Sequence, residues 1–149
     1  MRIAIGSDHA GFKLKEKIKS ALLNGQHKVI DLGTYSQESC DYPEYGFKVA
    51  RAVKSRKVER GILVCSSGIG MSIAANKVRG ARAALCNSLK AARLSRQHNN
   101  ANILVLAAKF TKSDRAIRMS RVWLREKFLG GRHSRRVKKI AQIERKNYR

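Results

Sequence analysis

The stretch GILVCSSGIGMSIAANKV, residues 61–78, decides the fold of this chain. Its first five residues form an apolar run bounded by glycine and small polar residues, which predicts a buried strand over 61–65. The last ten residues predict a helix over 69–78, and only a short loop of small residues separates the two. A strand that leads through a tight loop into a helix is typical of a parallel sheet covered by helices.

The rest of the chain repeats this alternation. Further strands are predicted at 2–6, 28–33, 81–86 and 102–107, and helical stretches at 12–23, 47–53, 88–97, 112–128 and 133–147. Gly130 and Gly131 predict the break before the last helix. We therefore expect an α/β protein, a Rossmann-like three-layer α/β/α sandwich on a five-stranded parallel sheet. One domain over residues 1–149 fits this length.

The composition bears on the cellular compartment and on whether the protein binds a metal or a membrane. The three cysteines are odd in number and widely spaced without a CxxC pair, so neither a disulfide framework nor a zinc site is expected. The N-terminus lacks the apolar segment of a signal peptide, and no apolar run approaches the roughly 18 residues of a membrane span. We expect a cytoplasmic protein without a membrane or metal partner.

The charge is extreme. The formal net charge is +23, and residues 109–149 alone contain 15 basic and 3 acidic residues. A positive field of this size speeds encounter with any anion, whether a phosphorylated sugar or a nucleic acid. No helix-turn-helix, zinc-finger or aromatic RNA-binding pattern accompanies it, so a nucleic-acid partner is not expected. A solvated basic helical surface is the alternative explanation.

Open parallel sheets bind ligands beyond the carboxyl ends of their strands. That rule selects four segments: GSDHAG (6–11), CSSGIGMS (65–72), the segment after the fifth strand, and DYP (41–43). The second is the most informative, because its backbone N–H groups and a helix N-terminus would favour an anion. It is neither a dinucleotide fingerprint nor a Walker A loop, which disfavours NAD and ATP.

Cys65 stands at the start of that loop. The same dipoles would favour its thiolate and move the thiol pKa down toward neutrality, where it can act as a base or nucleophile. A buried, inert cysteine that ends a strand is the alternative. Asp8 and His9 follow the first strand and should emerge at the same edge, although Asp8 could instead cap the following helix.

Each of the next candidate residues has two interpretations from the sequence. His98 is expected at the end of a helix, either as a C-terminal cation or as an acid/base group. Arg132 and Arg136 are four residues apart and could clamp a phosphate from one helix face, or could belong to a solvated basic face. His133 is expected to be a surface residue at a helix start.

The chain resembles the ribose-5-phosphate isomerase type B family, which also contains galactose-6-phosphate isomerase subunits. The resemblance is carried, in order, by IGSDHAGFKLKE, IDLGT, DYPEY, GILVCSSGIGMSIAANKVRGARAALC, SRQHNNANIL and GGRHSRRV, from residue 3 to about 145. It implies an aldose–ketose isomerase that interconverts D-ribose 5-phosphate and D-ribulose 5-phosphate through an enediolate, in the non-oxidative pentose phosphate pathway, without metal or cofactor.

The resemblance also implies roles for individual residues. Cys65 would be the base, His98 the proton donor that opens the cyclic sugar, and Ser67 a catalytic hydroxyl that stabilises negative oxygen. The implied substrate-binding residues are Asp8, His9, Tyr42, Ser66, Ser67, Gly68, Ile69, Gly70, Asn99, Lys109, Arg132 and Arg136. Where relatives often have Gly-Thr-Gly, this chain has Ser66-Ser67-Gly68, and Lys109 replaces a common arginine, which keeps the charge but loses the bidentate fork.

Members of the family are dimers, sometimes tetramers, so the resemblance implies a homodimer with shared active sites and a C-terminal helix that reaches the partner subunit. Two other functions stay open on the sequence. One is isomerisation of a hexose 6-phosphate such as allose or galactose 6-phosphate, which pocket length would decide. The other is a catalytically inactive protein that binds anions or nucleic acid.

Overall fold

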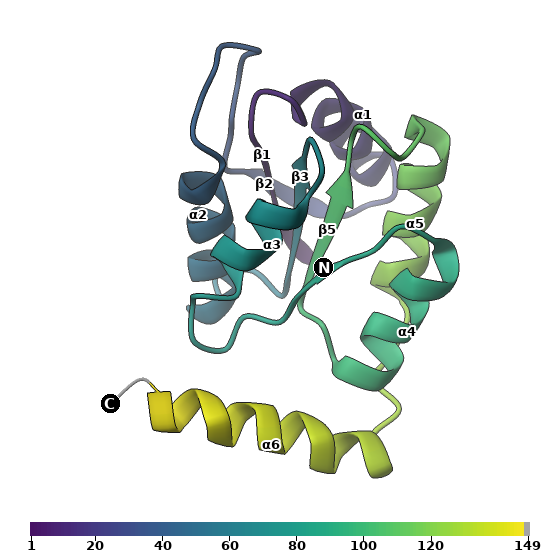
Figure 1. The fold of residues 1–149 in the computed structure, drawn as a ribbon. Coiled ribbons are helices and arrows are strands. Elements are labelled where there is room, and N and C mark those ends of the chain that lie inside the picture. The colour runs from purple at the N-terminus through teal and green to yellow at the C-terminus, as the bar shows by residue number, and fades with distance from the viewer. Residues whose placement is uncertain (148–149) are drawn as a thin grey trace.

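A computed structural model describes residues 1–147, in which strands and helices alternate as the sequence predicts (Figure 1). The strands are β1 (Arg2–Ser7), β2 (Lys28–Asp31), β3 (Arg60–Cys65), β4 (Ala83–Leu85) and β5 (Ile103–Ala107). The helices are α1 (Phe12–Leu23), α2 (Tyr42–Lys54), α3 (Ile69–Ala75), α4 (Leu89–Asn99), α5 (Ser113–Arg125) and α6 (Arg132–Asn147).

The five strands form one parallel sheet in the order β2-β1-β3-β5-β4. Ser7 of β1 pairs with Val64 of β3, and Cys65 of β3 pairs with Ala107 of β5. The central strands β1, β3 and β5 therefore end level with one another. Their following residues meet at one edge of the sheet, as the expectation for open α/β sheets requires.

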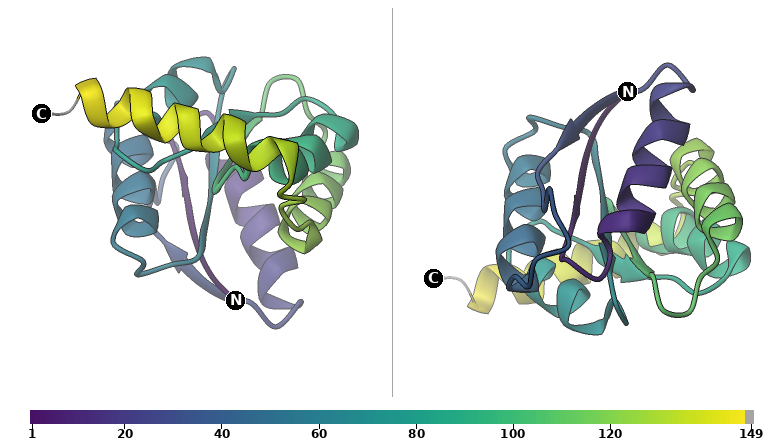
Figure 2. Two further views of the ribbon diagram at one scale, coloured as in Figure 1. Left: turned by 90° about the horizontal axis from the view of Figure 1, so that it is seen from below. Right: turned by 90° about the horizontal axis from the view of Figure 1, so that it is seen from above.

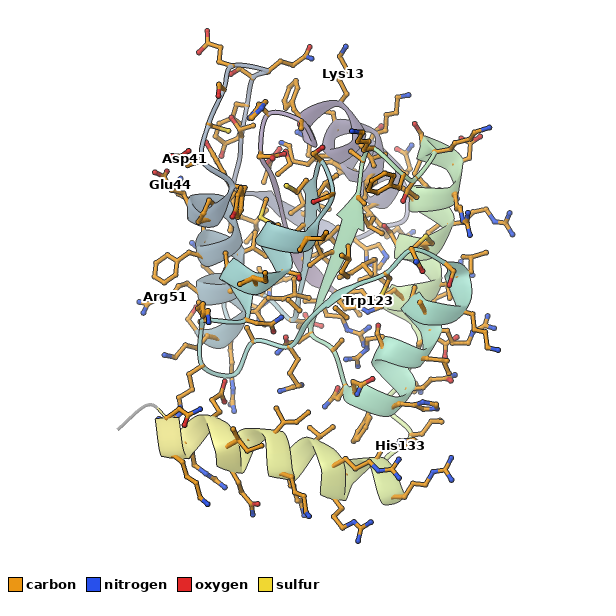
Figure 3. All side chains as sticks on the ribbon, in the orientation of Figure 1. Lys13, Asp41, Glu44, Arg51, Trp123 and His133 are labelled. Carbon is orange, nitrogen blue, oxygen red and sulfur yellow. The ribbon has the colours of Figure 1, made fainter. Side chains whose placement is uncertain are left out.

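Helices cover both faces of this sheet, giving the expected three layers (Figures 1 and 2). Successive side chains of a strand point to opposite faces. Ile3 and Ile5 therefore pack in the core under α1, α4 and α5, while Ala4 packs in the core under α2 and α3. Trp123 of α5, labelled in Figure 3, is fully buried in the first of these cores.

The last helix lies outside the sandwich. Gly130 and Gly131 both have positive φ, 68° and 53°, which confirms the predicted break before α6. From there α6 crosses the end of the molecule at which the strands begin (Figures 1 and 2). One tether to the body is the backbone N–H of Gly80, which donates to Glu144 at 2.7 Å.

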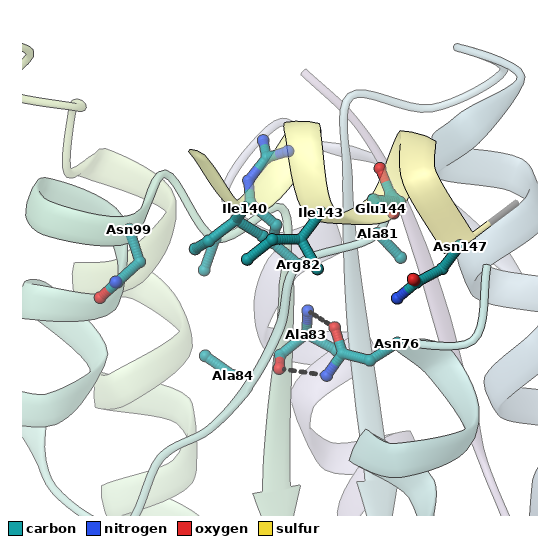
Figure 4. A pocket seen from close by; sticks show the side chains of 11 residues that line it. Asn76, Ala81, Arg82, Ala83, Ala84, Asn99, Ile140, Ile143, Glu144 and Asn147 are labelled. Carbon is teal, nitrogen blue, oxygen red and sulfur yellow. Dashed lines mark hydrogen bonds between the residues drawn. The ribbon is translucent and has the colours of Figure 1, made fainter. Parts of the chain in front are cut away.

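The predicted elements are confirmed, but several bounds differ. β2 ends at Asp31 rather than at residue 33, because Gly33 turns with φ 93°. α3 ends at Ala75 rather than at 78. There Asn76 donates to the carbonyl of Ser72 and exchanges two hydrogen bonds of 2.9 Å with the backbone of Ala83. These bonds end the helix and hold the start of β4 (Figure 4). Among the described residues, no helix is both long and apolar enough to cross a membrane.

Candidate active site

Asp8 and Cys65 face each other just beyond β1 and β3. The two strands are neighbours, and the pairing of Ser7 with Val64 makes Asp8 and Cys65 the next two residues in register. The thiol Sγ lies 3.0 Å from Oδ2 of Asp8, and both side chains are buried. Asp8 also accepts a 2.9 Å hydrogen bond from the backbone N–H of Gly11 through Oδ1. Asp8 therefore emerges at the same end of the sheet as Cys65, as expected. Its bond to Gly11 closes the turn before α1, but the N-cap of that helix is Gly11 and no side chain caps it, so the alternative that Asp8 caps the helix is wrong.

Gly11 brings this turn close to the cysteine. A Cβ at position 11 would overlap the carbonyl oxygen of Val64 and approach the backbone nitrogen of Cys65 at 3.1 Å. A side chain at position 11 would therefore push the start of α1 away from β3. The glycine of GSDHAG keeps the carboxylate of Asp8 within hydrogen-bonding distance of the thiol.

The expected lowering of the Cys65 pKa is wrong for this chain. Burial, together with the hydrogen bond and the negative charge of Asp8, raises the pKa of the thiol to about 11. The backbone N–H groups of Gly68 and Ser66 act in the opposite direction but are outweighed. The isolated chain therefore holds Cys65 as a neutral thiol at physiological pH.

The loop after Cys65 is shaped by its small residues. Ser67 accepts a 3.3 Å hydrogen bond from the N–H of Ile69, and Gly68 adopts φ 76°, in the left-handed region. A Cβ on Gly68 would also lie 2.6 Å from a methyl group of Leu85. Ser66 and Ser67 stay partly exposed, so their hydroxyls border the space beyond the strand end.

Tyr42 joins the loop from another part of the chain. It is the first residue of α2, and its ring lies so close to Gly70 that a Cβ there would stand 2.6 Å from the tyrosine hydroxyl. Lys109 lies in the turn that follows β5. Its backbone N–H donates to the carbonyl of Ser66 at 3.0 Å, beside an equivalent bond from Ala108 to Cys65. The structure thus brings both residues to this edge.

His9 is held by a residue that the sequence analysis did not select. The backbone N–H of Cys40 donates to Nδ1 of His9 at 3.2 Å. Because Nδ1 accepts this bond, the neutral ring carries its proton on Nε2. The segment between β2 and α2 therefore passes beside His9. No local sequence signal marks this contact, because 31 residues separate the partners.

His98, Asn99, Arg132 and Arg136 do not join this group. His98 and Asn99 end α4, just before β5 begins, and the two arginines lie in the first turns of α6. They therefore occupy the opposite end of the molecule from Cys65 (Figures 1 and 3). Within one chain, the base and the proton donor that the resemblance implies therefore lie at opposite ends of the strands.

The expectation that His133 is a surface residue is wrong. Its ring is buried, with 7% exposure, and stacks on that of His98 with centroids 4.1 Å apart and planes 9° from parallel. Burial lowers the pKa of His133, and the charges of His98, Arg132 and Arg136 lower it further. The motif GGRH contained this residue, but helix position alone gave no sign that it packs against α4.

The part of the chain that the structure describes contains no group of three or more His, Cys, Asp and Glu residues able to hold a metal ion. Cys40, Cys65 and Cys86 are all free thiols.

Fold and site together define a class of protein: a parallel α/β protein with a buried thiol–carboxylate pair beyond the carboxyl ends of adjacent central strands, where this fold binds its ligands. Comparison of sequences makes this specific. The chain belongs to the Ribose/Galactose Isomerase family, whose sequence model matches residues 3–140.

Individual relatives agree along nearly the whole chain. Ribose-5-phosphate isomerase B of Escherichia coli is 45% identical over 143 residues, which cover 96% of each chain. The structure of ribose-5-phosphate isomerase B from Clostridium thermocellum is similar with a TM-score of 0.97, at 51% identity over 99% of each chain. The enzyme from Mycoplasma genitalium, solved with bound ribulose 5-phosphate, gives a TM-score of 0.93 at 44% identity, covering 97% of this chain and 96% of that one.

Proposed function

We propose that this chain interconverts D-ribose 5-phosphate and D-ribulose 5-phosphate, with Cys65 as the base that moves a proton between C2 and C1. The observation that carries the proposal is the buried pair of Cys65 and Asp8 at the strand ends, in a chain whose relatives are ribose-5-phosphate isomerases B. Moving a proton between adjacent carbons needs an acid/base group and stabilisation of an enediolate, and the proposed reaction uses no metal or cofactor.

The proposed active site is assembled from two subunits. Cys65, Asp8, His9 and the loop 66–70 come from one chain, while His98, Asn99, Arg132 and Arg136 come from the partner subunit. This arrangement follows from the distance between the two groups within one chain, which lie at opposite ends of the sheet. A closed homodimer with twofold symmetry would form two such sites.

Helix α6 is the proposed contact with the partner. Ile140 and Ile143 are exposed on it at 47% and 60%, and a cavity of about 460 Å³ separates this part of α6 from the start of β4 at Ala83 (Figure 4). Apolar side chains above an open cavity are typical of a surface that another chain covers. Burial of this surface would hold Arg132 and Arg136 in place beside the partner's Cys65.

Assembly of the dimer would also lower the pKa of Cys65. The thiolate is the form that accepts a proton, and burial together with Asp8 disfavours it in the isolated chain. The guanidinium groups of Arg132 and Arg136 of the partner subunit would bring positive charge to the same space. A nearby positive charge favours the thiolate and lowers its pKa.

The remaining residues divide the other tasks. The backbone N–H groups at 68–70 and the Ser67 hydroxyl would stabilise the negative oxygen of the enediolate, and loss of one such donor typically raises a barrier by about 3 kcal/mol. His98 of the partner subunit would donate the proton that opens the cyclic sugar, with Asn99 as a polar contact. Tyr42, Asp8 and Ile69 would line the sugar, and Lys109, His9 and the two arginines would hold the phosphate.

We place this reaction in the cytoplasm, where a base that must stay reduced is protected from oxidation. The three free thiols support that placement. The single domain of 149 residues carries every residue that the mechanism uses.

Subunit complementation tests the proposal. Cys65→Ala and His98→Asn should each abolish turnover of ribose 5-phosphate while leaving the fold intact. In a mixed dimer, one site would combine the intact Cys65 of one chain with the intact His98 of the other. Mixing and reassembling equal amounts should then restore about a quarter of wild-type activity, because half of the dimers are mixed and each has one intact site.

The matched control pairs Cys65→Ala with Asp8→Ala, two changes in the same half of the proposed site. No mixed site is then intact, so activity should not exceed the average of the two parents. Near-wild-type turnover by Cys65→Ala alone would overturn the assignment of the base. Failure of Cys65→Ala and His98→Asn to complement would overturn the shared site.

A further inference from the structure

A second cavity lies at the end of the sheet where the strands begin, opposite the end that carries Cys65. It has a volume of about 470 Å³ and is bordered by the residues at which β1 and β3 begin and by the end of α4. Its lining is strongly basic: five arginines and a single carboxylate, namely Arg2, Arg56, Arg60, Arg82, Arg96 and Glu59. None of these residues has a task in the proposed isomerisation.

Arg96 is the most deeply buried of these arginines, with 6% exposure. Its Nη1 donates to Oδ1 of Asn100 and to the carbonyl oxygen of Ala101, but its Nε–H has no hydrogen-bond partner. No carboxylate of the described residues forms a salt bridge with it. A buried positive charge without a counter-ion is unfavourable.

The neighbouring guanidinium groups are also held by neutral acceptors. Arg60 donates from Nη1 to the carbonyls of Trp123 and Leu124, at 2.9 and 3.3 Å, and Arg82 donates from Nε to the carbonyl of Asn100 at 2.9 Å. Such bonds fix the orientation of a guanidinium without neutralising its charge. The carboxylate of Glu59 accepts from the backbone N–H of Arg2 and lies 3.9 Å from the Nε of the same residue. The negative charges of Glu59 and Glu144 also act on Arg60 and Arg82, whereas only positive charges act on Arg96.

The charges are close enough to act on one another. Burial, together with the positive charges of Arg60 and Arg82, lowers the pKa of Arg96 to about 10. Arg60 and Arg96 also both lie over the ring of Trp123, with their guanidinium carbons 5.3 and 5.8 Å from its centroid. An anion in this cavity would relieve the repulsion between the arginines.

We propose that this arginine-lined cavity binds a small phosphate-type dianion, either free or as the terminal group of a small ester, at a site separate from the substrate site. Planar guanidinium groups match the oxygens of a phosphate with paired hydrogen bonds. Backbone carbonyls hold the forks in place, so binding requires little ordering of side chains. The more exposed Arg56 lies at the rim, where it would make the outer contact.

Trp123 supplies a local reporter, because it is the only tryptophan of the chain and contacts two of the arginines. The experiment titrates the full chain with inorganic phosphate, pyrophosphate and glycerol 3-phosphate at constant ionic strength, with sodium chloride as the reference. Tryptophan fluorescence should change saturably with the phosphate compounds and not with chloride. Tighter binding of inorganic phosphate than of glycerol 3-phosphate would identify the free anion, and the reverse would identify an ester.

Three variants locate the response. Arg96→Gln and Arg56→Gln should each weaken the apparent affinity about tenfold, as expected for loss of one charged hydrogen bond. The isomerase kcat of Arg56→Gln should equal that of wild type. Arg136→Gln, which affects the proposed substrate site, should keep the full Trp123 response with unchanged affinity. Arg56→Gln carries the test if Arg96→Gln does not fold, because residue 56 is exposed.

Several results would overturn the proposal. The fluorescence change could fail to saturate, could be reproduced by chloride, or could be unaffected by both cavity substitutions. Loss of the response in Arg136→Gln would assign it to the substrate site instead. Binding of a short single-stranded DNA more tightly than pyrophosphate, with loss in Arg56→Gln, would replace the small dianion by a polynucleotide.

Discussion

The thiol of Cys65 donates a 3.0 Å hydrogen bond to the carboxylate of Asp8, so the proposed base lies against a group that keeps it protonated. The position of these residues follows from strand register, since β1 and β3 pair in parallel and end together. Their chemistry follows from burial and from the sign of the neighbouring charge. Burial and Asp8 together raise the pKa of Cys65 to about 11.

Asp8→Asn should lower the pKa of Cys65. The substitution removes the negative charge near the sulfur, while an amide oxygen can still accept the hydrogen bond from Gly11. The midpoint of Cys65 alkylation by iodoacetamide, followed by mass spectrometry as a function of pH, should move down by about one pH unit or more. Alkylation of Cys40 in the same samples is the internal control. An unchanged midpoint would mean that burial alone sets the pKa.

Gly70→Ala should displace Tyr42 from the loop. A Cβ at position 70 would lie within 2.7 Å of two ring carbons and the hydroxyl oxygen of Tyr42, so the side chain must move. We expect kcat/KM for ribose 5-phosphate to fall about tenfold or more, because the pocket wall shifts. In a Tyr42→Ala background the same substitution should cost little, since the obstructing ring is gone. Equal losses in the two backgrounds would show that the effect of residue 70 does not pass through Tyr42.

Much of the fold was predictable because it depends on local patterns. Apolar runs marked all five strands, and Gly130 and Gly131 marked the start of α6. The ends of β2 and α3 were placed too far along the chain. They depend on the φ of Gly33 and on the bonds from Asn76 to Ala83, which join residues seven positions apart and follow neither the helix nor the strand period.

The candidate site was only partly predictable for the same reason. The rule on strand ends brought Asp8 and Cys65 to one edge, but the sign of the Cys65 pKa shift required the burial and the 3.0 Å contact that only the fold supplies. The stack of His133 on His98 joins two helices, and no spacing within either helix encodes it.

His133→Ala should impair the proposed proton donor without unfolding the chain. The ring of His133 lies parallel to that of His98 at 4.1 Å, so its removal leaves His98 free to rotate. We expect kcat to fall up to about 100-fold, the loss typical of a misplaced catalytic group, while KM changes less. His133→Phe should recover most of the kcat, because a phenyl ring can stack without a charge. Equal kcat values for the two variants would argue against positioning by stacking.

Asp31→Asn should destabilise the fold through Lys15. The ammonium group of Lys15 is fully buried, 2.6 Å from the carboxylate of Asp31 and 2.8 Å from that of Glu16. Loss of one partner of a buried pair typically costs about 3 kcal/mol or more of unfolding free energy. Asp114→Asn, which removes an exposed carboxylate in the first turn of α5, is the matched control and should cost less than about 1 kcal/mol.

The pH dependence of that difference separates charge from shape. Burial raises the pKa of Asp31, but hydrogen bonds from Lys15, Lys19 and the backbone of Gly33 outweigh it and hold the pKa below its usual 3.8. A carboxylate whose pKa is lowered by folding stabilises the native state above its unfolded pKa, and this stability is lost as the pH falls through the folded value. In urea unfolding, the gap between wild type and Asp31→Asn should therefore be constant near neutrality and narrow below about pH 4. A gap that persists unchanged in acid would assign the loss to packing rather than to the ion pair.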